Sequence, residues 1–315
     1  MIFNGKEYNV PGITVGCESL GGIDWGNKDI SIISNVLIEA KERGFNCFDT
    51  ADVYGLGRSE ERISQIFKKS IKDIFIITKF GIKWKILKNI DRAETKIDLS
   101  LDYLDTALHN SLKRLNTDVI PLYLVHWPDK NSSIDLLINQ LEIYKKAGKI
   151  MNFGISNFTL NDISNETLKK VDAVCNSFSL LNAKKNIPIL REAKHHNISS
   201  FIYGTLEQGL LSGNYTRKSL FSNNDRRSRL KEFQKMENPK QQNLLSEIRK
   251  ISEKNDMSMS QVVFKWTNNQ QISNSLIMGI STIDQLTNLQ EAEKTSLSEN
   301  DIRLLNKLSN DYAEE

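Results

Sequence analysis

The sequence predicts a (β/α)8 barrel, because short apolar segments rich in β-branched residues alternate eight times with amphipathic segments of helical periodicity. A chain of 315 residues has a length typical of one such barrel. We expect a single domain over 1–315, since no linker rich in proline, glycine or serine divides the chain. A doubly wound sheet is the competing fold, but the glycine fingerprint that usually follows its first strand is missing.

The alternation gives each expected element a short range. The expected strands cover 13–17, 46–50, 74–80, 120–127, 150–156, 173–179, 199–205 and 275–280. The expected helices cover 30–43, 59–68, 99–115, 134–146, 159–169, 188–195, 242–255 and 283–291. Asn4-Gly5 between apolar residues predicts an N-terminal β-hairpin, and 298–308 predicts an extra C-terminal helix. A polar segment near 213–240 is long enough to suggest a functional loop.

Composition excludes several classes of function. The formal net charge is +3 and the basic residues are scattered, which argues against a nucleic-acid-binding face. The three cysteines, Cys17, Cys47 and Cys175, form no CxxC pair, so we expect a reducing compartment and no metal site. No apolar run approaches the roughly 20 residues of a membrane span, and the N-terminus lacks an apolar signal core. These observations together predict a cytoplasmic protein that binds neither nucleic acid nor membrane.

Polar residues stand directly after four of the expected strands. They are Asp49, Lys79, His126 and the pair Ser156-Asn157, at the ends of the second, third, fourth and fifth strands. In such barrels the catalytic groups collect at the carboxyl ends of the strands, an end that we call the barrel mouth. Tyr54 joins them on a loop closed by Gly55 and Gly57. Taken singly, Asp49 with Lys79 could be a structural ion pair and His126 a core histidine, but together they favour a catalytic cluster.

This combination of side chains suits the protonation of a developing alkoxide. A tyrosine has an ordinary pKa of about 10, and a nearby ammonium is expected to lower the pKa of Tyr54. Asp49 would keep Lys79 charged and oriented, and His126 could orient a carbonyl oxygen or assist proton transfer. No side chain delivers hydride, so the cluster implies a nicotinamide cofactor.

The motifs around these residues resemble the aldo-keto reductases, and in particular the bacterial branch similar to the β subunits of voltage-gated potassium channels. The matching motifs are Asp49-Thr50-Ala51 with Tyr54-Gly55, Thr78-Lys79, Val125-His126-Trp127-Pro128 and Gly154-Ile155-Ser156-Asn157-Phe158, in the order of the family. The resemblance implies that Tyr54 is the general acid and that Asp49, Lys79 and His126 complete a catalytic tetrad. It also implies NADPH bound in extended form across the barrel mouth.

The resemblance assigns cofactor and substrate residues as well. The implied cofactor residues are Ser156 and Asn157 for the carboxamide; Cys175, where the family usually has glutamine; Tyr203 for stacking; Thr205, where the family usually has proline; Leu206, Gln208 and Gly209 over the pyrophosphate; Arg226 in a basic segment that closes over the phosphates; and Gly279, Ser281 and Gln285 at the adenosine phosphate. Trp25 and Trp127 are expected to line the substrate entrance. The hydroxyls of Ser281 and Thr282 favour NADPH, with NADH as the alternative.

The predicted function is reduction of an aldehyde, ketone or sugar-like carbonyl to the alcohol, with a small molecule as the partner. Two alternatives stay open at this stage. One is a non-catalytic NADPH-binding regulatory or partner subunit on the same fold, and the other is a sugar-pathway lyase or epimerase that uses bound cofactor transiently. The sequence carries no pattern that predicts an oligomeric state or the physiological substrate.

Overall fold

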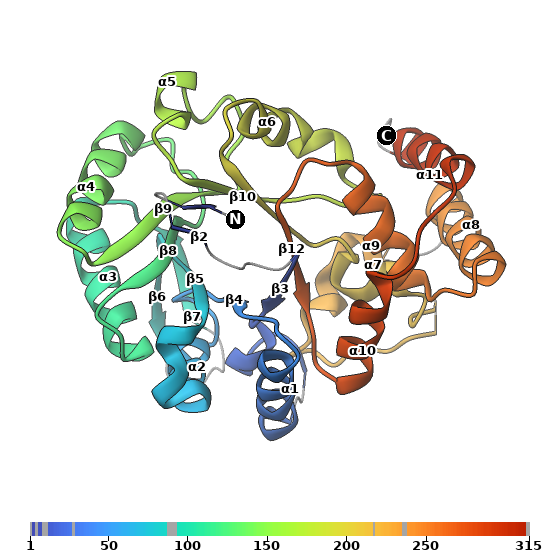
Figure 1. Ribbon diagram of the computed structural model, residues 1–315, viewed down its shortest axis with the longest axis horizontal. Helices are drawn as coiled ribbons and strands as arrows, with labels where there is room; N and C mark the ends of the chain where they lie inside the picture. Colours follow the sequence, from blue (N-terminus) through green and yellow to red (C-terminus); the bar gives the residue numbers. More distant parts are fainter. Residues whose placement is uncertain are drawn as a thin grey trace.

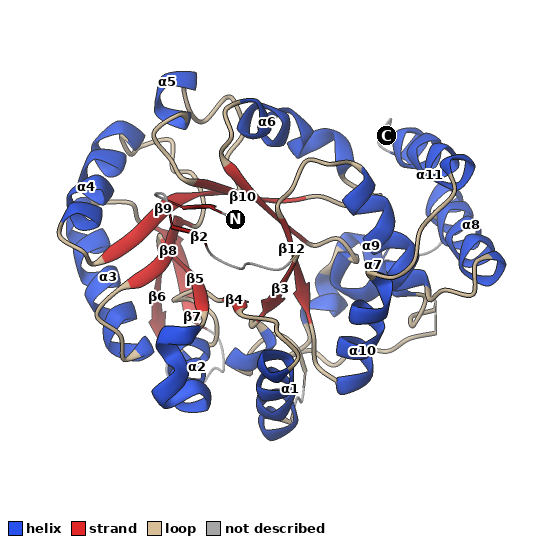
Figure 2. Cartoon of the chain, viewed as in Figure 1, coloured by secondary structure: helices blue, strands red, loops and turns tan. Residues whose placement is uncertain are grey.

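A computed structural model shows eight parallel strands closed into a barrel and surrounded by helices, which confirms the (β/α)8 barrel (Figures 1 and 2). The structure describes residues 2–3, 6–7, 12–26, 29–86, 93–216, 218–234 and 238–312. The barrel strands are β3 (Ile13–Gly16), β4 (Cys47–Asp49), β5 (Phe75–Phe80), β8 (Ile120–Val125), β9 (Ile150–Ser156), β10 (Ala173–Ser177), β11 (Ser199–Tyr203) and β12 (Ser275–Gly279). They are hydrogen-bonded in chain order, and β12 pairs with β3 to close the barrel. Both ends of each barrel strand lie within two residues of the ends expected from the sequence.

The helices form the outer layer of the barrel (Figure 2). They are α1 (Ile30–Glu42), α2 (Arg58–Phe67), α3 (Leu101–Leu115), α4 (Ile134–Lys146), α5 (Asn165–Leu168), α6 (Ala183–His195), α7 (Lys231–Gln234), α8 (Pro239–Lys254), α9 (Met259–Asn269), α10 (Ile283–Ala292) and α11 (Glu299–Tyr312). The expected C-terminal helix is α11, which packs against α8 and α6. None of the helices in the described ranges combines the length and the apolar character needed to span a bilayer.

Side-chain alternation along the strands divides the core into two parts. Every second residue of a strand points into the barrel interior. These inward residues are Cys47, Phe75, Ile77, Leu122, Leu124, Ala173, Cys175, Phe201 and Ile277. The residues that alternate with them, such as Phe48, Ile76 and Tyr123, point outward and pack beneath the helices. Because side chains alternate with a period of two, Asp49 and Lys79 continue the inward set of β4 and β5 at the barrel mouth.

Two hairpins lie outside the barrel. The expected N-terminal hairpin is present as β1 (Ile2–Phe3) paired antiparallel with β2 (Lys6–Glu7), while its Asn4-Gly5 turn lies outside the described residues. A second hairpin, β6 (Ile82–Ile86) with β7 (Ala93–Ile97), follows β5 and was not expected from the sequence.

Four helices differ from the sequence expectation, and one of them is the short α7, which lies in the segment 213–240 that was expected to be a loop. The helix expected over 159–169 is only α5, because Asp162 accepts hydrogen bonds from the backbone and hydroxyl of Thr159 and closes a turn there. The helix expected to begin at Pro188 begins at Ala183, with Pro188 inside it. Helix α9 was not expected, although its capping box of Ser258 and Gln261 is a sequence signal that predicts a helix start.

Candidate active site

The buried ion pair between Lys79 and Asp49 lies at the centre of the barrel mouth. Lys79 Nζ donates to Asp49 Oδ2 at 2.6 Å and to the backbone oxygen of Thr50 at 2.8 Å. Both side chains are almost fully buried, and burial raises the pKa of Asp49 against the opposing pull of the Lys79 ammonium. A buried charge is stable only when it is paired and hydrogen-bonded, as this one is. The expected convergence of strands β4 and β5 on one site is therefore present.

Tyr54 is held beside this pair by a tight turn. The turn is closed by hydrogen bonds from Tyr54 N to Ala51 O at 3.1 Å and from Leu56 N to Val53 O at 2.9 Å. Gly55 has φ of 62° and packs on Gly21 so closely that a Cβ at Gly55 would overlap the Gly21 backbone. The Lys79 ammonium lies 5.1 Å from the centroid of the Tyr54 ring. The turn thus places a partly exposed phenol over the ammonium.

The expected lowering of the Tyr54 pKa is wrong for this structure. Burial raises the pKa of Tyr54 well above its ordinary value, and the carboxylates of Glu18 and Asp49 add to the rise. The physical reason is that burial disfavours the charged phenolate more strongly than the Lys79 ammonium, partly compensated by Asp49 at 2.6 Å, favours it. Tyr54 consequently keeps its proton near neutral pH.

His126 completes the group from the end of β8. Its backbone N–H donates to Phe80 O at 2.8 Å, and its ring meets the Tyr54 ring edge-on at 5.9 Å between centroids. Burial lowers the pKa of His126 well below its ordinary value, and the Lys79 charge acts in the same direction. Its Nδ1 is buried without a hydrogen-bond partner in the described part of the chain. A neutral imidazole therefore faces the phenol.

Ser156 and Asn157, which are expected to bind the nicotinamide carboxamide, connect the tetrad candidates to the neighbouring strands. Asn157 has φ of 65°, and its Nδ2 donates to His126 O at 2.9 Å and to Ser156 Oγ at 3.2 Å. The Tyr203 hydroxyl donates to Asn157 Oδ1. The ends of β8, β9 and β11 are thereby joined through one amide.

Cys175 and Thr205, which stand where the family usually has glutamine and proline, are both buried. Cys175 belongs to the barrel interior, and burial raises the pKa of its thiol to about 12, so the thiol stays protonated. The Thr205 hydroxyl is also buried and contacts Met278 Sδ at 3.1 Å. Both side chains therefore contact other residues of the barrel in the structure.

The basic segment with Arg226 is tied to the loop that follows β3. Arg226 pairs with Glu18, and its guanidinium lies 5.7 Å from the Trp25 ring centroid. The backbone of Arg226 donates to Asp24 O at 2.9 Å, and Arg229 pairs with the Asp24 carboxylate at 2.9 Å. Glu18 was missed from the sequence, although an acidic residue directly after the first strand was a signal.

The residues expected at the adenosine phosphate stand at the start of α10. Ser281 N donates to Gln285 Oε1 at 2.7 Å, and Thr282 Oγ1 caps the helix by accepting from Gln285 N at 3.2 Å. Gly279 ends β12 on open surface, where no atom lies within 4 Å of the position of a Cβ. The half-buried Ser281, with its hydroxyl, and a helix N-terminus are suitable for a phosphate.

The order of strands places the predicted cofactor residues along one side of the barrel mouth. Strands β9, β10, β11 and β12 are consecutive in the barrel, so the ends of β9, β11 and β12 lie along one arc of the mouth. The tetrad candidates occupy the adjoining arc of β4, β5 and β8. The polar side chain of Asn157 lies at one end of the first arc, and the open surface at Gly279 lies at the other.

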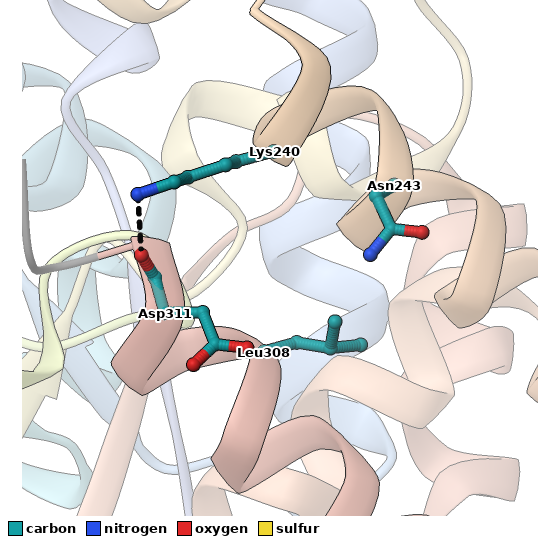
Figure 3. A pocket seen from close by; sticks show the side chains of 4 residues that line it. All are labelled: Lys240, Asn243, Leu308 and Asp311. Carbon is teal, nitrogen blue, oxygen red and sulfur yellow. Dashed lines mark hydrogen bonds between the residues drawn. The ribbon is translucent and has the colours of Figure 1, made fainter.

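Two grooves among the described residues are lined by none of the candidate residues. A groove of about 340 Å³ between α8 and α11 is lined by Lys240, Asn243, Leu308 and Asp311, with Lys240 Nζ bonded to Asp311 O at 2.9 Å (Figure 3). A second groove of about 500 Å³ lies outside the loops after β8 and β9, next in the chain to Trp127, whose side chain is 40 % exposed. No cluster of three or more metal-ligating side chains occurs among the described residues.

Asp52, two residues before Tyr54, is a buried carboxyl that the sequence did not single out. It is 1 % exposed, and neither oxygen has a side-chain partner in the described ranges. Burial raises the pKa of Asp52 well above its ordinary value, and nearby Glu60 adds to the rise while Arg114 opposes it.

Asp52→Asn is expected to increase stability at neutral pH and to flatten its pH dependence. As pH rises above about 4, the unfolded chain loses this proton while the folded chain keeps it, so Asp52 lowers the free energy of unfolding by up to about 1.4 kcal/mol per pH unit until its folded pKa is reached. Urea unfolding between pH 4 and 8 measures this effect, with the exposed Asp118→Asn as control. If the free energy of unfolding depended on pH in the same way for Asp52→Asn and the unchanged protein, the Asp52 carboxyl would not be protonated in the folded state.

The barrel and the mouth cluster define a class of protein, the (β/α)8-barrel enzymes with a tyrosine, lysine, histidine and aspartate at the carboxyl ends of the strands. A sequence model of the Aldo/keto reductase family matches residues 13–310. The chain belongs to this family, whose members are oxidoreductases that use nicotinamide cofactors on small carbonyl compounds.

Individual relatives agree with this assignment. The chain is 31 % identical over 263 residues to the aldo-keto reductase yakc [NADP(+)] of Schizosaccharomyces pombe, covering 82 % of this chain and 76 % of that protein. It is 26 % identical over 300 residues to the NADH-specific methylglyoxal reductase of Escherichia coli, covering 92 % and 91 %. The structure is similar to the glycerol dehydrogenase AKR11B4 of Gluconobacter oxydans, with a TM-score of 0.84, 25 % identity, and coverage of 98 % and 94 %.

Proposed function

We propose that the protein reduces an aldehyde, ketone or sugar-like carbonyl to the alcohol with NADPH, and that Tyr54 is the general acid. The observation that carries this proposal is the position of a protonated Tyr54 phenol between the Lys79–Asp49 pair and a neutral His126 at the barrel mouth. Asp49, Tyr54, Lys79 and His126 are the proposed tetrad, and the cofactor and substrate residues predicted from the sequence keep their proposed roles.

Each tetrad member has a separate task in this proposal. The nicotinamide, when bound, supplies hydride to the carbonyl carbon. The Tyr54 hydroxyl gives its proton to the carbonyl oxygen as negative charge develops there, and solvent later returns a proton to the phenolate. The Lys79 ammonium stabilises that phenolate, since it lies over the ring and two of its N–H groups already hold it in place. The neutral His126 orients the carbonyl oxygen through a ring nitrogen.

NADPH is the proposed cofactor because Ser281 presents a hydroxyl beside the N-terminus of α10, where a phosphate would bind. The relatives support either cofactor, since one is named for NADP(+) and another is named NADH-specific. The cytoplasmic location and the single-domain organisation stay predictions from the sequence.

Ser281→Ala is expected to weaken NADPH binding about tenfold, since a hydrogen bond to a charged phosphate is lost, and to leave NADH binding unchanged. The dissociation constants follow from fluorescence titration of each cofactor. Ser281→Thr keeps the hydroxyl and serves as the matched control. Equal losses for both cofactors would argue against a phosphate at Ser281.

The direct test of the function is consumption of NADPH and NADH with a panel of aldehydes, ketones and sugars. Turnover with at least one carbonyl supports the proposal. Tight NADPH binding without turnover on any of them would favour a binding subunit, and product formation without net cofactor change would favour a lyase or epimerase. The relatives named as reductases and the complete proton-donating set favour turnover.

A further inference from the structure

The loop after β11 has an unusual backbone. Glu207, Gln208 and Gly209 have consecutive positive φ values of 46°, 53° and 94°, and Gly204 before them has φ of 72°. Non-glycine residues in the left-handed region are strained and persist only where surrounding contacts hold them. We call residues 204–209 the cofactor loop, since Thr205, Leu206, Gln208 and Gly209 are proposed to contact the cofactor.

A buried carboxylate fastens this loop to the neighbouring one. The Glu207 side chain turns away from solvent, and the residue is only 8 % exposed. Its Oε1 accepts hydrogen bonds from the Ser179 hydroxyl and from Asn182 Nδ2, the latter at 2.9 Å. Asn182 Oδ1 in turn accepts from Ser179 N at 2.8 Å. The network joins the loops that follow β10 and β11, two adjacent strands of the barrel.

Glu207 has no ion pair in the described part of the chain, and of the two charged residues of α7, Lys231 and Glu232, neither forms one with it. Burial raises the pKa of Glu207 to about 7, the Ser179 hydrogen bond opposes this rise, and Glu232 on α7 adds to it. Lys265, the charged residue of α9, donates instead to Glu293 O at 3.2 Å. The segment 178–182 carries no charged residue. The ionised carboxylate is therefore held mainly by Ser179 and Asn182.

The loop that Glu207 fastens directly follows Tyr203, at the nicotinamide end of the proposed site. Tyr203 is the last residue of β11, and burial, Cys175 and Glu18 raise its pKa more than the Glu207 charge does. Tyr203 donates to Asn157, which bonds to the backbone of His126. The loop that Glu207 fastens therefore adjoins the rim that the proposed cofactor would cover.

We propose that Glu207 is a positioning residue, whose carboxylate holds the strained cofactor loop in the shape that receives the dinucleotide. The proposal rests on the proposed function. Glu207 does not touch the reacting atoms, and it acts through the backbone of Leu206, Gln208 and Gly209. A carboxylate accepts stronger hydrogen bonds than a carboxylic acid, so the loop is held more firmly above pH 7 than below it.

Two variants of Glu207 separate this role from a general structural one. Glu207→Ala removes the acceptor and is expected to weaken NADPH binding about tenfold, with kcat at saturating NADPH within about threefold of the unchanged protein. Glu207→Gln keeps one acceptor oxygen for Ser179 and Asn182 and is expected to restore binding to within about threefold. NADPH fluorescence gives the dissociation constants, and circular dichroism melting shows whether each variant is folded.

The pH profile gives a readout that loss of packing would not change. Between pH 8 and pH 6 the affinity of the unchanged protein for NADPH is expected to fall more steeply than that of Glu207→Gln, because only the former loses the carboxylate. Titration of the NADPH phosphate is common to both proteins and cancels in the comparison. Identical profiles, or an alanine variant that binds as tightly as the unchanged protein, would overturn the proposal.

Hydrogen exchange of the cofactor-free protein tests, independently of the proposed function, whether the hydrogen bonds of Glu207 to Ser179 and Asn182 hold the loop. We call these hydrogen bonds the anchor. The amides of 204–213 are expected to exchange faster in Glu207→Ala and in Asn182→Ala, and no faster still in the double variant, since both changes break one network. Unchanged exchange would refute the anchor even if NADPH binds. Faster exchange in a protein that binds neither NADPH nor NADH would keep the anchor but reject both the proposed function and the role of Glu207 toward a cofactor.

Discussion

Tyr54→Phe is expected to lower kcat for carbonyl reduction by about three orders of magnitude, which is within the usual contribution of a positioned general acid. The variant removes one hydroxyl and keeps the ring that lies over Lys79 and against His126. Cofactor affinity is expected to change by less than about threefold, because the phenol hydroxyl is not among the proposed cofactor contacts. Steady-state NADPH oxidation measures kcat, and fluorescence titration measures the dissociation constant of NADPH.

The matched control for this variant is Tyr144→Phe. Tyr144 lies on α4, and its hydroxyl donates to Asp105 at 2.7 Å, on the outer layer of the barrel. Its removal is expected to leave kcat and NADPH affinity unchanged. If Tyr54→Phe retained the turnover of the control, another group would have to supply the proton, and the role proposed for Tyr54 would be wrong.

Lys79→Met is expected to abolish turnover and to lower the free energy of unfolding by about 3–5 kcal/mol. Asp49 and the backbone oxygen of Thr50 both lose their donor, and the Asp49 carboxylate is left buried without a counter-charge. The loss of stability is expected to be greatest above neutral pH and to shrink toward pH 4, because protonation of Asp49 then removes the unpaired charge. Urea unfolding at several pH values measures the effect.

A double variant separates the structural from the chemical contribution of this pair. Asp49→Asn in the Lys79→Met background removes the unpaired charge and is expected to recover part of the lost stability without recovering activity. Equal destabilisation of the single and double variants would show that lost packing, not the orphaned carboxylate, causes the effect. Recovery of turnover in the double variant would contradict the stabilisation of the phenolate by Lys79.

The strand ends were predictable because two simple rules act on local sequence. Side chains alternate along a strand, and the chain order of a (β/α)8 barrel brings successive strand ends to one rim. Asp49, Lys79 and His126 follow apolar runs with the inward parity, so their convergence with Tyr54 could be inferred before any coordinates. The capping box of α9 was equally local, and that helix could have been predicted as well.

The properties that were not predicted depend on groups distant in the sequence. Arg226 meets Glu18 across 208 positions, and Glu207 reaches Ser179 across 28. The ionisation of Tyr54 follows from its burial and from how completely Asp49 balances Lys79, and neither quantity is encoded in a motif. The sequence by itself therefore determined which residues stand at the barrel mouth. Only the tertiary structure decided their charge states and partners, because solvation and Coulomb interactions depend on distance in space and not along the chain.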